Sequence, residues 1–205
     1  QQYRIVESKW MESAKHLAFA SYGEVFFSPI YKSLLFDTGS LGKRKEIGII
    51  SNGVLFTEEY FQMLKERYAK ISSVSISVDA ACEETYQVVR GGNWKKLNEN
   101  LINLATHRRN GEIESIKLTF VTQMCNITEI YDFIKYAREL GVDRVMFQKI
   151  HWSEDMTMEE FQEIFSITDA QGVLKEEAVE VLAKAELNDP LVDWFQLYEY
   201  ILYAK

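Results

Sequence analysis

The sequence is poor in the residues that mark several large classes of protein. Its 205 residues include two cysteines, three histidines and two prolines. Cys82 and Cys125 are too few and too far apart for a disulfide framework or a local metal-binding knuckle. The histidines show no metal-ligand spacing, and no Ser/His/Asp set can be assembled from them. We therefore predict neither a hydrolase nor a metal site made by these residues.

Long apolar runs and an excess of positive charge are also absent. No stretch of about 18 apolar residues is available to span a membrane, and no signal-peptide pattern opens the chain. The formal net charge of −8 argues against nucleic acid as a partner, because such partners usually need a basic face. We interpret the basic groups at 43–45 and 107–109 as solvated helix ends. We expect a cytoplasmic protein without nucleic-acid or membrane partners, and its oligomeric state is left open.

What the chain does contain is an alternation of strand-like and helical stretches. The composition, 47% hydrophobic, suffices for one core or one domain with an appendage. Such alternation implies right-handed parallel crossovers, and therefore part of a β/α barrel or a doubly wound sheet. Asn126 and Glu129 also resemble a capping box that begins a helix. Strands are expected at 17–21, 47–50, 74–78, 116–121 and 145–150, with helices around 5–15, from Pro29, from Thr57, over 94–108 and from 126 to Gly141.

Small polar residues recur where the expected strands end. Strands buried on both faces should read as continuous apolar runs, so these residues indicate a cavity at the carboxyl ends. Within the third strand, Ser75, Ser77 and Asp79 share one face because side chains alternate. For any single strand, the same residues could simply begin a loop. The segments concerned are Ser21-Tyr22-Gly23-Glu24, Ser51-Asn52-Gly53, 75–79, Val121-Thr122-Gln123 and Phe147-Gln148-Lys149.

These motifs, in this order, resemble the core of radical S-adenosylmethionine (SAM) proteins. The resemblance rests on Gly23-Glu24, Ser51-Asn52-Gly53, Ser77-Val78-Asp79, Thr85-Tyr86 and Arg90-Gly91-Gly92, and it runs from about Leu17 to Ile150. The tail, with Trp152, Phe161 and 189–192, is similar to a segment in one bacterial subgroup of uncharacterised function. The resemblance implies a partial parallel β/α barrel of about five to six strands that binds SAM at the carboxyl ends of its strands.

Individual roles follow from the resemblance, position by position. With Gly23 beside it, Glu24 would accept hydrogen bonds from the methionine ammonium. Ser77 and Arg90 would hold the methionine carboxylate, for which arginine offers a planar fork. Asp79 and Asn52 would lie near the ribose or shape the pocket, while Gln123 and Gln148 would belong to the polar rim. Each has a structural alternative: Asp79 as a helix cap, Asn52-Gly53 as a turn, and Arg90 as the partner of a surface carboxylate.

The sequence departs from the family at the iron-sulfur cluster. The family holds a four-iron four-sulfur (4Fe-4S) cluster with a Cys-x-x-x-Cys-x-x-Cys loop, which Cys82 and Cys125 cannot replace. This chain alone should therefore be catalytically silent. Either the native protein has an N-terminal strand and cysteine loop that this sequence lacks, which we favour, or it is a cluster-free binding domain. In the first case the whole protein would use SAM and the cluster to form a 5′-deoxyadenosyl radical.

We expect a division into a radical-SAM-like barrel at 1–151 and a mostly helical extension at 152–205. The substrate, a peptide or a small molecule, cannot be read from the sequence. Two other interpretations are kept. In the first, an aromatic tail docks a partner, although helical spacing favours core packing. In the second, Lys149 is the Schiff-base residue of a lyase or aldolase fragment. The tail aromatic residues are Trp194, Phe195, Tyr198, Tyr200 and Tyr203.

Overall fold

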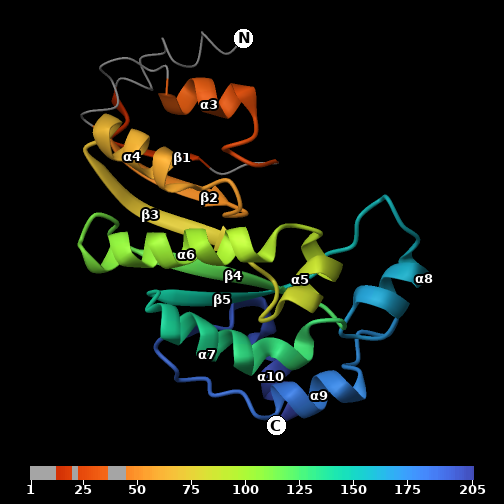
Figure 1. Cartoon of the computed structure of the whole chain (residues 1–205). Helices are drawn as coiled ribbons and strands as arrows, with labels where there is room; N and C mark the ends of the chain where they lie inside the picture. Colours follow the sequence, from red (N-terminus) through yellow and green to blue (C-terminus); the bar gives the residue numbers. More distant parts are fainter. Residues whose placement is uncertain (1–12, 20–22, 37–44) are drawn as a thin grey trace. The chain divides into compact units, whose positions relative to one another are not determined.

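The computed structural model describes residues 13–19, 23–36 and 45–205, in which strands alternate with helices (Figure 1). Most of the helix expected around 5–15 lies outside the described residues, as do Ser21, Tyr22, Lys43 and Arg44. The strands are β1 (His16–Phe19), β2 (Glu46–Ser51), β3 (Lys70–Ser77), β4 (Ile116–Thr122), β5 (Arg144–Lys149) and β6 (Val192–Asp193). The helices are α3 (Pro29–Phe36), α4 (Glu58–Arg67), α5 (Glu83–Arg90), α6 (Trp94–Arg109), α7 (Ile130–Leu140), α8 (Met158–Glu160), α9 (Glu176–Leu182) and α10 (Tyr198–Ala204), with short turns η2 (Ile127–Glu129), η3 (Phe161–Phe165) and η4 (Phe195–Leu197).

The strands form one six-stranded parallel sheet in the order β1-β2-β3-β4-β5-β6. In the pairs β1/β2, β2/β3 and β5/β6 the register runs parallel. β1 and β6 stand at opposite ends of this order, so the sheet is not closed. The prediction of an α/β fold with a partial parallel barrel is therefore confirmed.

Contacts divide the chain into two compact units. The first unit comprises residues 1–77 and 93–117, and the second comprises 78–92 and 118–205. Residues 152–205 thus belong to the same unit as most of β4 and all of β5. The domain boundary expected at residue 151 stays a prediction.

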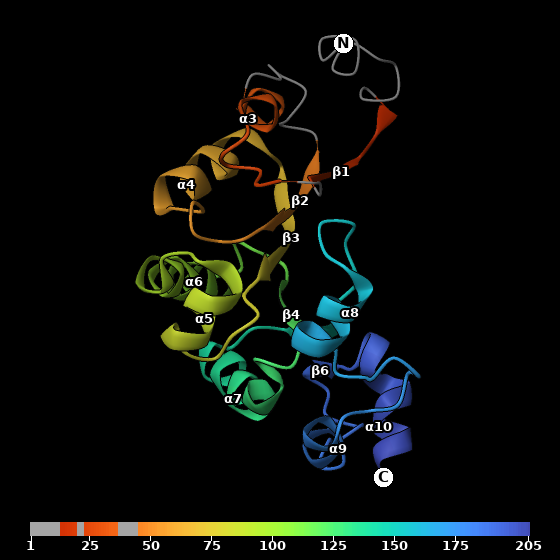
Figure 2. The same cartoon turned by 90° about the vertical axis from the view of Figure 1, so that its right-hand side faces the viewer.

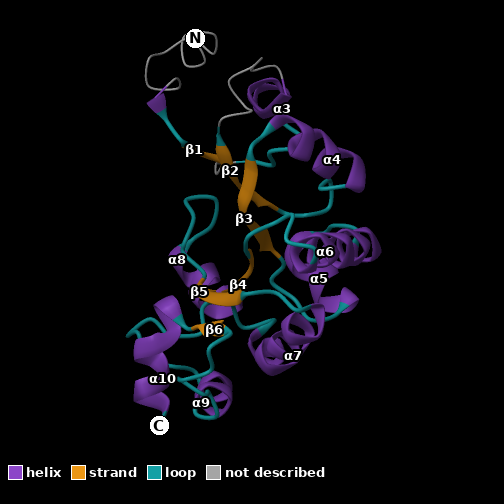
Figure 3. Cartoon of the chain, turned by 90° about the vertical axis from the view of Figure 1, so that its left-hand side faces the viewer, coloured by secondary structure: helices purple, strands orange, loops and turns teal. Residues whose placement is uncertain are grey.

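In the first unit, helices α3, α4 and α6 lie on one side of strands β1 to β3 (Figure 3). The strand side chains that are buried there, Ile47 and Ile49 of β2 and Val74 and Ile76 of β3, alternate with smaller or polar residues. An extra residue in β3, Ser72, shifts the register beside Ile47 and donates to the Ile47 carbonyl at 3.0 Å. This alternation places the serines of β3 on the face opposite the helices.

In the second unit, aromatic rings form the core. Phe120 of β4 lies 4.9 Å from Phe133 of α7 and 5.4 Å from Phe147 of β5, measured between ring centroids. Trp194 stacks on Phe147 at 5.0 Å, directly after β6 pairs with β5. The C-terminal segment is therefore part of this core, and its helices α9 and α10 lie side by side (Figure 2). Among the described residues, no helix combines the length and the apolar character needed to cross a membrane.

Local sequence signals fix some of the helix ends. Thr57 caps α4 by accepting from the Tyr60 N–H, and Gly141 ends α7 in the left-handed conformation, both as expected. The capping box expected at Asn126 and Glu129 is wrong. The Asn126 side chain makes no cap hydrogen bond to the helix, which begins as the short turn η2. Both side chains instead bind groups outside their own helix, as described below.

Candidate functional site

In the first unit, Glu24 binds the carboxyl end of β2. Its Oε1 accepts from the Ser51 hydroxyl at 2.7 Å and from the Phe26 N–H at 3.2 Å, while its Oε2 accepts from the Asn52 N–H at 2.7 Å. Gly23 precedes it with a positive φ of 106°. The structure therefore brings Glu24 and Asn52 together, while the roles expected for them toward SAM stay predictions. Hydrogen bonds to a carboxylate are stronger than neutral ones, so this contact holds the segment after β1 against β2.

The turn after β2 is tightly packed. Gly53 has a φ of 78°, and a β-carbon on it would lie 2.6 Å from Leu97 Cδ1 and 2.8 Å from Ile76 Cγ2. Only glycine fits this combination of backbone angle and space. From helix α6, Asn100 donates to the carbonyls of Gly53 and Val54 at 2.8 and 2.9 Å. Sequence reasoning missed Asn100, although a polar residue inside the Leu97, Leu101 and Leu104 stripe was a signal.

In the second unit, Asp79 and Arg90 form a partly buried ion pair. The Arg90 guanidinium lies 2.5 Å from Asp79 Oδ2, and the Asp79 and Arg90 side chains are 4% and 30% exposed. Asp79 Oδ1 accepts from the Val121 N–H at 2.8 Å, so the carboxylate also holds the end of β4. Burial raises the pKa of Asp79, while Arg90 and the Val121 N–H act in the opposite direction. Asp79 has a φ of 64°, a conformation that aspartate and asparagine tolerate better than most residues.

Asp79 does not cap the following helix, since the N-cap position of α5 is Cys82. The alternative in which Arg90 meets a surface carboxylate is likewise replaced by a pair with a buried one. Ser77, the last residue of β3, is half-buried and belongs to the first unit. The roles expected for Ser77, Asp79 and Arg90 toward SAM stay predictions.

Asn126 organises the loop after β4. Fully buried, it donates to the carbonyls of Asp79 and Val121, both at 2.9 Å, and accepts from the Gln123 N–H at 2.9 Å. Gln123 is also buried, and within the described part of the chain its side chain makes no hydrogen bond. Its expected place on a polar rim stays a prediction, as does that of the half-buried Gln148.

Glu129 holds the loop between β3 and α5. Its carboxylate accepts from the Ala81 N–H at 2.6 Å and the Cys82 thiol at 3.2 Å, and from the Thr85 hydroxyl. The following residue of the motif, Tyr86, is buried, and burial raises its pKa. A β-carbon on Gly92 would lie 2.9 Å from the Tyr86 hydroxyl, so the motif glycine allows this close contact.

The cysteines do not form a metal centre. Cys82 is engaged with Glu129, while Cys125 is exposed and desolvation raises its pKa, which favours the thiol over the thiolate. In the part of the chain that the structure describes, no group of three or more His, Cys, Asp and Glu side chains could hold a metal ion. A 4Fe-4S cluster needs more thiolates than this sequence contains. The residues present therefore do not fit the cluster.

At the carboxyl end of β5, Lys149 meets the C-terminal segment. Its ammonium donates to the Tyr200 hydroxyl at 3.2 Å and lies 5.6 Å from the centre of the same ring. The Lys149 N–H donates to Gln196 Oε1, which leaves the Gln196 amide to donate to His151 Nε2 at 3.1 Å. The Lys149 ammonium is thus engaged with Tyr200, and the Schiff-base role considered for Lys149 stays a prediction.

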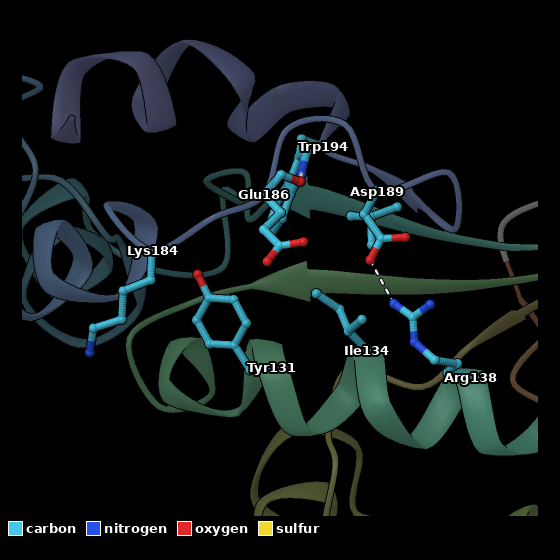
Figure 4. Close-up of a pocket in the computed structure, with 8 residues that line it drawn as sticks. Tyr131, Ile134, Arg138, Lys184, Glu186, Asp189 and Trp194 are labelled. Carbon is cyan, nitrogen blue, oxygen red and sulfur yellow. Dashed lines mark hydrogen bonds and ion pairs between the residues drawn. The ribbon is translucent and has the colours of Figure 1, made fainter.

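A cavity of about 350 Å³ lies in the second unit, between α7 and the segment that leads into β6 (Figure 4). None of the residues expected to bind SAM lines it. Its wall includes the ion pair between Arg138 and Asp189, 2.6 Å apart. Asp189 also accepts from the Leu191 N–H at 3.0 Å, and the Leu191 carbonyl accepts from Val145 of β5. The Asp189-Pro190-Leu191-Val192 motif thus attaches the tail to the sheet.

Comparison with known proteins finds solved structures with a similar fold. No protein-family model and no curated protein matches the sequence. Among solved structures, TYW1 with a bound lysine-pyruvate adduct aligns over 83% of this chain at 18% identity, with a TM-score of 0.50. SuiB of Streptococcus suis, bound to S-adenosylmethionine, aligns over 75% at 13% identity and a TM-score of 0.53. HydG, a maturase of the FeFe hydrogenase, aligns over 99% at 12% identity and a TM-score of 0.52.

The chain has a radical SAM fold. This confirms the resemblance read from the strand-end motifs at the level of the fold. The alignments cover 49% of the TYW1 chain, 34% of SuiB and 46% of HydG, so the chain spans half or less of each of these proteins. At these identities the likeness concerns the course of the backbone, and binding has to be argued from the side chains.

Proposed function

We propose that this chain binds SAM at the carboxyl ends of its strands, as the SAM-binding part of a radical SAM enzyme. The observation that carries the proposal is the Glu24 carboxylate, held at the carboxyl end of β2 by Ser51 and Asn52. SuiB, which shares this fold, has been solved with SAM bound, which supports the proposal at the level of the fold.

Glu24 retains capacity for a ligand. A carboxylate offers about four lone-pair sites, and the hydrogen bonds to Phe26, Ser51 and Asn52 use three of them. The remaining site is on Oε2, which accepts only the Asn52 N–H among the described groups. An ammonium such as that of methionine fits this site by charge and by hydrogen bonding. Asn52 also keeps its amide N–H₂ for a ligand hydroxyl, since its Oδ1 accepts from Val54.

Arg90 retains capacity for a carboxylate. A guanidinium has five N–H donors, and the described contact uses the Nη2 group toward Asp79. The other donors of this partly exposed side chain are available for the methionine carboxylate. Asp79, with both oxygens engaged, would act on the ligand through Arg90 and would be a positioning residue. As the resemblance implies, we propose Ser77 beside the methionine carboxylate and Gln123 on the polar rim.

When bound next to a reduced cluster, SAM supplies the hydrogen-abstracting chemistry of radical SAM enzymes. The residues of this chain do not fit a 4Fe-4S cluster, so no step of that chemistry is assigned to them. We propose that a cysteine loop outside this sequence completes the native enzyme. Its substrate, a peptide or a small molecule, is not specified by any residue described above.

Calorimetric titration of the chain with SAM tests the proposal. Glu24→Gln should weaken binding about 10- to 100-fold, because it removes a charged acceptor for the ammonium. Glu59→Gln, at an exposed carboxylate of α4 in the same unit, is the matched control and should leave binding unchanged. Arg90→Lys should weaken binding about tenfold by replacing the fork with a point charge, whereas Arg144→Lys, in another Arg–Asp pair, should not. Equal SAM affinity in all four variants would overturn the proposal.

A second candidate is a cluster-free domain whose tail docks a protein partner. Trp194 is buried and Tyr200 contacts Lys149, but Phe195, Tyr198 and Tyr203 are 55%, 49% and 68% exposed. Exposed aromatic residues are common anchors in interfaces. This second function is correct if Glu24→Gln and Arg90→Lys bind SAM as the wild type does, while Phe195→Ser with Tyr203→Ser abolishes association with the protein partner.

A further inference from the structure

The cavity beside α7 has rigid aromatic walls. Trp194 is buried, stacks on Phe147 and donates from Nε1 to the Glu186 carbonyl at 3.0 Å. Tyr131 of α7 donates from its hydroxyl to the Val181 carbonyl at 2.8 Å. Two aromatic side chains are thus held in fixed positions around the hollow, and Ile134 and Val192 add apolar surface to its lining. A volume of about 350 Å³ is in the range of small-molecule sites.

The charged side chains around the cavity differ in whether a neighbouring charge neutralises them. Arg138 is neutralised by Asp189, 2.6 Å away. The Lys184 ammonium points away from the other labelled side chains, whereas the Glu186 carboxylate points between Tyr131 and Ile134 (Figure 4). Across the described segments the Glu186 carboxylate makes no hydrogen bond and no ion pair, although its charge acts on Tyr131. The charge that faces the hollow without compensation is therefore negative.

A carboxylate beside tyrosine and tryptophan side chains is suited to a cation. The negative face of an aromatic ring attracts an ammonium or guanidinium group within about 6 Å, and the Glu186 carboxylate adds a charged acceptor. The apolar side chains Ile134 and Val192 suit a short hydrocarbon stem. An anion would instead be repelled by the charge of Glu186, an exposed residue at the edge of the cavity.

We propose that this cavity binds a primary ammonium or guanidinium group on an apolar stem, as carried by a lysine or arginine side chain or by a free alkyl amine. Glu186 accepts from the cation, Tyr131 and Trp194 face it, and Ile134 and Val192 contact the stem. This site lies wholly within the second unit and shares no residue with those proposed for SAM. The two proposals can therefore fail separately.

NMR titration of the ¹⁵N-labelled chain tests the site, with the Trp194 indole N–H signal as the reporter. The probes are pentylamine, the tripeptide Gly-Lys-Gly, norleucine amide with its amine acetylated, and hexanoate. Pentylamine should shift the Trp194 signal in a saturable way. Glu186→Gln should weaken its binding about tenfold or more, because a charged acceptor is lost. Glu180→Gln on the neighbouring helix α9 is the matched control and should leave binding unchanged.

The probes also separate the sources of the cation. Binding of the tripeptide and of pentylamine supports the site for a lysine side chain, and binding of pentylamine alone supports it for a free amine. Hexanoate or the acetylated norleucine amide binding as tightly as pentylamine would overturn the proposal, because charge would then not select the ligand. Unchanged affinity in Glu186→Gln would overturn it as well. SAM binding, measured in the same variant, should stay at the wild-type level.

Discussion

Removing Arg90 should leave a buried carboxylate without its partner. Asp79 is 4% exposed, and its contact to Arg90 is 2.5 Å. Breaking a buried ion pair by deleting one partner costs about 3–5 kcal/mol. Because the Arg90 side chain is 30% exposed and solvent reaches the pair, we expect the lower end, about 3 kcal/mol for Arg90→Ala at neutral pH. In urea this corresponds to a midpoint lowered by about 1–2 M.

The loss should depend on pH in a defined direction. Burial already raises the pKa of Asp79 in the folded state, and removal of the guanidinium raises it further. A folded-state pKa above the unfolded value means that protonation favours the folded state. As the pH falls through that folded pKa, the deficit of Arg90→Ala should therefore shrink. Urea denaturation followed by circular dichroism at pH 7.5 and pH 5 measures this difference.

A second substitution separates the buried charge from lost packing. Asp79→Asn keeps an acceptor for the Val121 N–H and tolerates the positive φ at this position. The double variant, with Asp79→Asn and Arg90→Ala, should recover most of the stability lost in Arg90→Ala alone. If the deficit is the same at both pH values, or the double variant is no more stable than Arg90→Ala, the buried-charge argument is refuted.

Three further predictions concern the first unit. Gly53→Ala should cost about 2–4 kcal/mol of stability, from backbone strain and overpacking. The control Gly172→Ala should cost about 1 kcal/mol from strain alone, because Gly172 has a φ of 81° but a β-carbon there would meet no atom within 4 Å. Equal losses in thermal denaturation would contradict the packing argument. Asn100→Ala should cost about 1–3 kcal/mol, because two backbone carbonyls lose their donor; a loss below about 0.5 kcal/mol in urea would mean that water replaces it. Hydrogen bonds from Gln62 and His107 lower the pKa of Glu58 below 4.5, and hydrogen bonds from Lys65 and His107 lower the pKa of Glu112. The stability that these carboxylates contribute is therefore present above pH 4.5. It is lost as the pH falls through their pKa values in the folded state. The destabilisation of His107→Ala should thus shrink on acidification below pH 4.5, and a constant difference across the acid limb would argue against it.

The sequence predicted the architecture because the signals for it are local. Apolar runs and Gly141 marked elements that the structure contains within a few residues of the expected bounds. The hydrogen bonds between side chains and backbone at the strand ends were only partly predictable from the sequence, because they join residues far apart in the chain. Asn126 was interpreted as a helix cap because its local context fits one, but tertiary contacts with Asp79 and Val121 decide its role. His107, interpreted as part of a solvated helix end, instead stacks on Phe61 at 3.7 Å.

The polar residues at the strand ends first satisfy backbone groups that the ends of β-strands leave without partners. Asp79 and Asn126 are buried and engage the chain with each of their polar side-chain atoms, whereas the less buried Glu24 keeps a lone pair and Arg90 keeps several N–H donors. Ligand binding at these ends should therefore depend on Glu24 and Arg90, while folding should depend on Asp79 and Asn126. Two substitutions separate the two effects. Arg90→Lys should lower SAM affinity with a small change in stability, and Asn126→Ala should do the reverse, with unfolding as its main effect.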